Sequence, residues 1–119
     1  MNSYKDLIVW KKSIELVIEI YKITDKLPKS EIYGLTSQMR RSAVSIPSNI
    51  AEGYARKNRK EYAQFIRISF GSGAELETQI IISKNLKLID MKNFEKADKL
   101  LDEIMRMLNK FITSLVAKP

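Results

Sequence analysis

One apolar pattern near the C-terminal end of the chain restricts the fold more than any other feature of the sequence. Seven side chains recur there at alternating spacings of three and four residues: Phe94, Ala97, Leu101, Ile104, Leu108, Phe111 and Leu115. This spacing places them on one side of a helix, which we expect over residues 91–116. Burying such a stripe contributes on the order of 10 to 20 kcal/mol, and ordering the backbone costs at least as much. The helix therefore needs partners, and the pattern indicates a helical bundle.

Similar patterns predict three further helices, over residues 4–26, 31–53 and 59–84. Ser3 and Asp6 resemble a capping box at the start of the first helix. Pro28 ends this helix, because proline disfavours helical geometry in the residue before it. Gly53 suits a left-handed cap at the end of the second helix, and a second capping-box pattern begins at Asn58.

Four helices with short connections and no strand-like alternation predict an all-α fold. We expect residues 1–119 to form a single domain, an antiparallel up-down-up-down four-helix bundle. Four aromatic side chains are expected at its centre: Trp10, Phe65, Phe94 and Phe111. The small residues around Gly71 and Gly73 favour close approach of another backbone, which the Pro47 region of the second helix supplies.

The segment QMRRSAVSIPSNIAEG, residues 38–53, continues the apolar spacing of the second helix across an internal proline. Pro47 cannot donate to the helix ladder, and its ring collides with the carbonyl four residues earlier. We therefore expect one helix, kinked at Pro47 with the bend near Ala43. Its opposite side is polar and carries Gln38, Arg41, Ser45, Ser48, Asn49 and Glu52.

This polar side fits two interpretations. Small hydroxyls beside charged groups suit a hydrogen-bonded contact between helices or subunits. Alternatively, Glu52 acts as a base for a Ser45 or Ser48 nucleophile, but without histidine or a well-placed lysine such a serine stays poorly activated. The structural interpretation is favoured.

The absence of cysteine and histidine excludes several function classes. Disulfides, thiol chemistry, Ser-His and Cys-His nucleophile pairs and the usual zinc and di-iron ligand sets are all ruled out. The sequence therefore predicts no enzymatic activity, no cofactor and no metal. We also expect no membrane association and a cytoplasmic location, because no apolar run is long enough to cross a bilayer and no signal-peptide pattern is present.

The net charge of +7 is concentrated in the first half of the chain. Residues 1–60 hold twelve basic and six acidic side chains, whereas residues 61–119 hold nine and eight. The candidate nucleic-acid-binding residues are Arg40, Arg41, Arg56, Lys57, Arg59, Lys60 and Arg67. Such a cluster favours RNA phosphates, with Tyr54 and Tyr62 stacking on bases. The alternative is a solvated basic turn whose arginines pair with nearby acids or a neighbouring subunit.

A second apolar stripe on the helix over residues 4–26 suggests self-association. This helix is apolar on two faces, and the end of the third helix carries surplus isoleucines. We expect these candidate contacts between copies of the chain: Val9, Leu16, Ile20, Ile23, Ile81 and Ile82. Left exposed on a monomer they form a large apolar patch. The alternative is simply a wide core.

Three runs of the sequence, DLIVWKKS, EIYGLTSQMRRSAVSIPSNIAEGYAR and EYAQFIRISFGSGAELET, carry a family resemblance. Through them the chain resembles the 23S rRNA intervening-sequence protein family of bacterial four-helix bundles over nearly its whole length. It is more distantly similar to the accessory variability determinant protein of diversity-generating retroelements, a pentamer that cooperates with a reverse transcriptase and nucleic acid. One departure is the run 85–87, Asn-Leu-Lys, where relatives often have a glycine-containing turn.

The resemblance implies a homo-oligomer, specifically a pentamer, that contacts RNA and has no catalytic activity. Together with the residues, it predicts a non-enzymatic, self-associating bundle whose basic face binds RNA or a nucleic-acid-processing protein. The alternative is a purely structural homo-oligomer with no nucleic-acid role.

Overall fold

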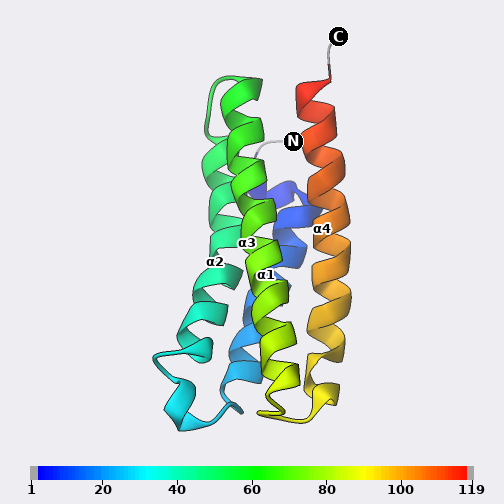
Figure 1. Cartoon of the computed structure of the whole chain (residues 1–119). Helices are drawn as coiled ribbons and strands as arrows, with labels where there is room; N and C mark the ends of the chain where they lie inside the picture. The colour runs from blue at the N-terminus through cyan, green and yellow to red at the C-terminus, as the bar shows by residue number, and fades with distance from the viewer. Residues whose placement is uncertain (1–2, 118–119) are drawn as a thin grey trace.

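Four α-helices form the framework of residues 3–117, the part of the chain that the computed structural model describes. Their bounds are α1 Ile8–Thr24, α2 Leu35–Tyr54, α3 Arg59–Asn85 and α4 Glu95–Val116. Consecutive helices run in opposite directions (Figure 1). The loop that joins α2 to α3 and the C-terminal end of α4 lie at the same end of the molecule. Each helix packs against the next, and α1 also packs against α4. The predicted all-α antiparallel up-down-up-down bundle is confirmed.

Three of the helices begin four residues later than the sequence predicts, because a 3-10 turn occupies each expected start. These turns are Tyr4–Asp6, Lys29–Glu31 and Met91–Phe94. Ser3 Oγ accepts from the Lys5 N–H at 3.1 Å and so caps a 3-10 turn, not α1. Asp90 acts in the same way before α4, accepting from the Lys92 N–H at 2.9 Å. Short polar side chains thus favour turns that compete with the first helical turn.

The start of α3 follows the sequence prediction. Asn58 Oδ1 accepts from the Glu61 N–H at 2.9 Å, and α3 begins at the next residue after Asn58. This bond satisfies one of the N–H groups that have no partner within the helix.

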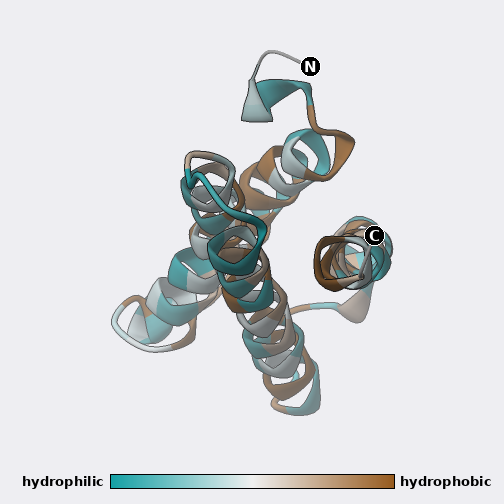
Figure 2. Cartoon of the chain, turned by 90° about the horizontal axis from the view of Figure 1, so that it is seen from above, coloured by the Kyte–Doolittle hydropathy of each residue, from teal (hydrophilic) through white to brown (hydrophobic). Residues whose placement is uncertain are grey.

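The core lies between the four helices and consists mainly of aliphatic side chains. Figure 2 marks the hydrophobic residues of each helix in brown. The largest fully buried members of the core are Phe94, Leu16, Ile20, Met39, Ile46, Ile50, Ile66, Leu76, Ile80, Ile104 and Leu108. Of the four aromatic residues expected at the centre, only Phe94 is fully buried. Trp10, Phe65 and Phe111 are partly exposed, because branched aliphatic side chains fill the narrow space between the helices.

The second stripe of α1 belongs to this core. Val9, Leu16, Ile20 and Ile23 are at most 4% exposed within a single chain, so the expectation that they contact another copy is wrong. The physical reason is that α1 packs against both α2 and α4 and buries a wide face. Ile81 and Ile82 differ, since both are exposed on α3.

Pro47 lies inside α2 without dividing it, and the opposing face of α3 is built from serines. Ser69 Oγ donates to the backbone carbonyl of Ile46 at 2.8 Å. The hydroxyls of Ser45 and Ser72 lie 2.8 Å apart, one on each helix. These short side chains bring α2 and α3 together beside the proline, as expected for a contact between small residues.

The roles of three glycines, Gly53, Gly71 and Gly73, differ from those that the sequence predicts. Gly53 is buried within α2 and does not have a left-handed conformation. A Cβ on it would lie 2.8 Å from Phe65 Cβ and 2.9 Å from Tyr62 Cδ1, so α3 requires a glycine there. Gly73 faces Met105 of α4, not Pro47, and Gly71 faces open space.

Candidate nucleic-acid interface

The residues between α2 and α3 and the first turn of α3, together called the α2–α3 connection, lie at one end of the bundle (Figure 1) and include four basic residues. Arg56, Lys57, Arg59 and Lys60 are all exposed. Among the described residues neither Lys57 nor Lys60 takes part in an ion pair. Two free ammonium groups three residues apart therefore face solvent on a turn held by the Asn58 cap.

The two arginines of this connection are partly held by the bundle. The Arg56 guanidinium lies 4.7 Å from the centre of the Phe65 ring, and its Nη2 is 3.9 Å from Glu52 Oε2. Arg59 donates to the backbone carbonyl of Ser114 at 2.7 Å, near the C-terminal end of α4. A cation is favoured there because the last carbonyls of a helix carry partial negative charge.

The tyrosines beside the connection belong to a ladder of aromatic rings. Tyr54 lies edge to face with Tyr4 and with Tyr62, at 6.3 Å and 6.2 Å between ring centres. Tyr62 also meets Phe111 at 5.1 Å. Burial raises the pKa of Tyr62 to about 12, with a smaller contribution from Tyr54. Both rings already pack against other aromatic rings of the protein. The structure therefore does not favour the prediction that they stack on RNA bases.

Arg40, Arg41 and Arg67 lie apart from the connection. Arg40 lies 14 residues before Tyr54, the last residue of α2, which is about 21 Å along the helix axis at 1.5 Å per residue. Arg40 closes the contact with α1: it donates to Thr24 Oγ1 at 2.8 Å and Asp25 Oδ1 at 2.9 Å. The expectation that the seven basic residues form one cluster is wrong, because helix length separates them.

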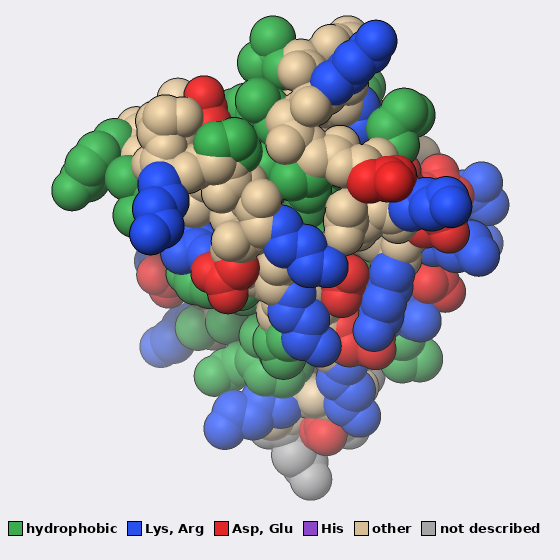
Figure 3. All heavy atoms as spheres, turned by 90° about the horizontal axis from the view of Figure 1, so that it is seen from below, with side chains coloured by type: hydrophobic (Ala, Val, Ile, Leu, Met, Phe, Trp, Pro, Cys, Tyr) green, Lys and Arg blue, Asp and Glu red, His purple; other side chains and the backbone are tan. Residues whose placement is uncertain are grey.

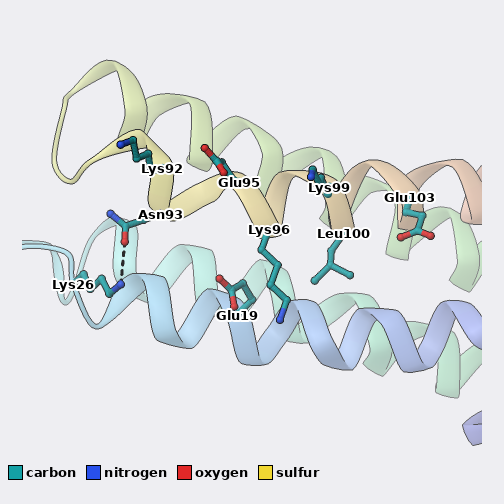
Figure 4. Close-up of a pocket in the computed structure, with 9 residues that line it drawn as sticks. All are labelled: Glu19, Lys26, Lys92, Asn93, Glu95, Lys96, Lys99, Leu100 and Glu103. Atoms are coloured by element: carbon teal, nitrogen blue, oxygen red, sulfur yellow. Dashed lines mark hydrogen bonds between the residues drawn. The ribbon is translucent and has the colours of Figure 1, made fainter.

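Sequence reasoning missed a lysine groove between α1 and α4, shown in Figure 4. This hollow of about 590 Å³ is lined by Lys26, Lys92, Lys96, Lys99, Glu19, Glu95, Glu103, Asn93 and Leu100. The spacing of Lys96 and Lys99 on α4, with Lys92 four residues earlier in the preceding 3-10 turn, is the signal that could have indicated it. Three glutamates offset its positive charge. Figure 3 shows the same mixture of basic and acidic side chains over the end of the bundle opposite the α2–α3 connection.

Exposed apolar side chains mark two further surfaces. A groove of about 290 Å³ between α1 and α2 is lined by Tyr4, Trp10, Ile14, Val17, Val44, Pro47, Ser48 and Ala51. On α3, Ile68, Ile81 and Ile82 are each at least 42% exposed. Tyr33, in the α1–α2 connection, is 95% exposed.

The polar side of α2 makes structural hydrogen bonds. Besides its contact with Ser72, Ser45 accepts from Asn49 Nδ2 at 2.9 Å and is held in place. Residues 3–117 contain no group of three acidic, histidine or cysteine side chains placed to hold a metal ion. Within the same range, no helix has the length and apolarity required to span a bilayer.

These features define a small basic four-helix bundle. The chain belongs to the 23S rRNA-intervening sequence protein family, whose model matches residues 5–110. It is similar in fold to a protein with unknown function from the S23 ribosomal protein family of Bacteroides thetaiotaomicron, solved by crystallography. The TM-score is 0.81 at 23% sequence identity, covering 88% of this chain and 98% of the other. A comparison with curated proteins gave no match.

Proposed function

We propose that the protein is a non-enzymatic RNA-binding bundle that contacts phosphates through the α2–α3 connection. The observation that carries this proposal is the pair of unpaired, exposed ammonium groups of Lys57 and Lys60, each directly following an arginine. Each phosphate that such a group neutralises releases counterions, so the affinity falls steeply with salt. The aromatic ladder packs α2, α3 and α4 together beside these four cations.

A salt titration with an RNA hairpin carrying an unpaired loop tests the proposal. We expect the affinity, measured by fluorescence anisotropy, to fall strongly between about 50 and 200 mM salt. The Lys57→Gln/Lys60→Gln double variant should bind more weakly and lower the slope of log affinity against log salt by about 0.7 per lost contact on single-stranded RNA. Replacing Arg56 and Arg59 as well should weaken binding further.

The matched control replaces two lysines of the α1–α4 groove, Lys96→Gln/Lys99→Gln, which changes the net charge equally. If the interface is at the α2–α3 connection, this control retains most of the affinity. Equal losses in both double variants indicate only a general effect of net charge, and unchanged affinity in the Lys57/Lys60 variant contradicts the proposal.

A second function, self-association, is favoured by the exposed isoleucines of α3 and the apolar groove between α1 and α2. They lie on different helices, and a contact between two different surfaces generates a ring when the rotation closes. The resemblance noted above suggests a pentamer. If RNA binding fails, this is the alternative: a structural homo-oligomer whose charges keep it soluble.

Sedimentation velocity and light scattering test the assembly. The wild-type protein should have the mass of several chains, and Ile81→Glu/Ile82→Glu should reduce it toward one chain. Thr78→Glu, an exposed position on the same helix, is the control for added charge and should leave the mass unchanged. A wild-type mass equal to one chain contradicts self-association.

A further inference from the structure

Buried polar side chains occur at two places between α2 and α3, and the two places differ in hydrogen bonding. Near Pro47, Ser45 and Ser72 share a hydrogen bond and Ser69 donates to a backbone carbonyl. Farther along α3, Gln79 is only 8% exposed, and its Oε1 has no hydrogen-bond partner within the described structure. Native proteins rarely leave a buried carboxamide oxygen unpaired.

Gln79 lines a pocket between the two helices. The pocket has a volume of about 190 Å³ and is lined by Gln38, Arg41, Ser42, Ser45, Glu75 and Gln79. Ser42 and Gln79 are buried, whereas Arg41 and Glu75 are exposed and so lie toward its mouth. Within residues 3–117, Arg41 and Glu75 form no ion pair with one another or with any other side chain.

Three features therefore converge on one small space: an unpaired cation, an unpaired anion and an unpaired buried carboxamide oxygen. A guanidinium binds a carboxylate through two parallel hydrogen bonds, and a carboxylate accepts hydrogen bonds from an ammonium group. A molecule carrying both charges can engage Arg41 and Glu75 together, while its polar atoms reach Gln79.

We infer that this pocket binds a small zwitterion of the α-amino acid class. Arg41 holds the carboxylate of the ligand, Glu75 holds its ammonium group, and Gln79 with Ser42 supplies hydrogen bonds from the pocket wall. The volume corresponds to roughly six water molecules at about 30 Å³ each, which suits an amino acid with a short side chain.

Calorimetry with L-alanine, glycine and L-serine tests this inference on the full chain. We expect at least one of the three to bind. Two analogues of alanine distinguish the contributions of its two charges to binding. Propionate lacks the ammonium group, and ethylamine lacks the carboxylate. Each should bind about tenfold or more weakly than L-alanine, because each loses one charge-assisted interaction.

Three variants locate the site. Arg41→Gln and Glu75→Gln should each weaken amino acid binding about tenfold, and Gln79→Met, of similar size, should weaken it while raising the melting temperature of the free protein. Arg67→Gln and Glu77→Gln change exposed charges of α3 outside the pocket and should leave binding unchanged. No binding by any of the three amino acids, or equal binding in all variants, overturns the inference and leaves a pocket that holds only water.

Discussion

Ser45 on α2 and Ser72 on α3 place their hydroxyl oxygens 2.8 Å apart, in direct contact across the two helices. One turn away, Ser69 donates to the carbonyl of Ile46, the residue before Pro47. Pro47 itself lacks the N–H that a helix uses at this position. The α2 backbone around the proline is therefore supported from α3, and this requires short side chains that allow close approach.

A double-mutant cycle on Ser45→Ala and Ser72→Ala should measure this contact. Each single change removes a partly buried hydrogen bond and should lower the free energy of unfolding by about 1 kcal/mol. The double variant should cost less than the sum, because the bond between the two hydroxyls can be lost only once, whereas the Asn49 contact of Ser45 is lost equally in both backgrounds. Urea unfolding provides the measurement, with Thr78→Ala as an exposed control. Strict additivity would show that the two hydroxyls do not interact.

Gly53 and Gly71 should respond in opposite ways to alanine. A Cβ at Gly53 would meet Tyr62 and Phe65 at under 3 Å, so Gly53→Ala should destabilise the protein by about 1–3 kcal/mol. A Cβ at Gly71 meets nothing within 4 Å, so Gly71→Ala should stabilise the protein by about 0.5–1 kcal/mol. Thermal unfolding of the two variants checks both signs, and a stabilised Gly53→Ala protein would contradict the close approach of α3.

The apolar periodicity of the sequence predicts the fold well. Apolar side chains that repeat every three and four residues lie on one face of a helix, and this face is buried when the helices pack as a bundle. The periodicity does not predict which of two stripes on α1 is central. Leu16 and Ile20 are core residues, whereas Trp10 lies at the edge of the core. This difference depends on how much of the α1 surface α2 and α4 cover. Ser3 likewise suits a cap, but whether a cap starts an α-helix or a 3-10 turn depends on the following backbone.

Stability at high pH should depend on Tyr62. Burial, then the proximity of Tyr54, raises the pKa of Tyr62 from 10.0 to about 12. The folded state therefore holds this proton more tightly than the unfolded state, so the contribution is intact below about pH 10 and is lost as the pH rises toward about 12. Tyr62→Phe should flatten the decline of stability in this window while keeping the ring contact with Phe111. An identical decline in both proteins would assign it to other groups.

The candidate interface could be predicted only in part. Local sequence brings Lys57 and Lys60 together, because a short connection between helices keeps its residues close. Sequence proximity misplaces Arg40, since α2 carries it far from the connection, and it cannot reveal the groove between α1 and α4, whose Lys26 and Lys99 come from distant segments. Predicting the pocket at Gln79 would also require the rotation of α2 and α3 about their axes relative to one another, and apolar periodicity alone does not determine this rotation.

Arg40 should separate stability from RNA binding. Its guanidinium lies 4.4 Å from the centre of the Tyr21 ring and donates to Thr24 and Asp25, joining α2 to α1. Arg40→Gln should therefore lower the free energy of unfolding by about 1 kcal/mol, since one bond reaches a buried hydroxyl and the exposed Asp25 pair adds little.

The RNA affinity of this variant should nevertheless stay close to that of the wild type, because the charge removed lies far from the α2–α3 connection. Lys57→Gln/Lys60→Gln should show the reverse: weaker RNA binding with the free energy of unfolding changed by less than about 0.5 kcal/mol, as for exposed surface changes. Urea unfolding and anisotropy on both variants check this crossover. A strong loss of RNA affinity in Arg40→Gln would place the interface on the α1–α2 side, where Arg40 and Tyr21 lie.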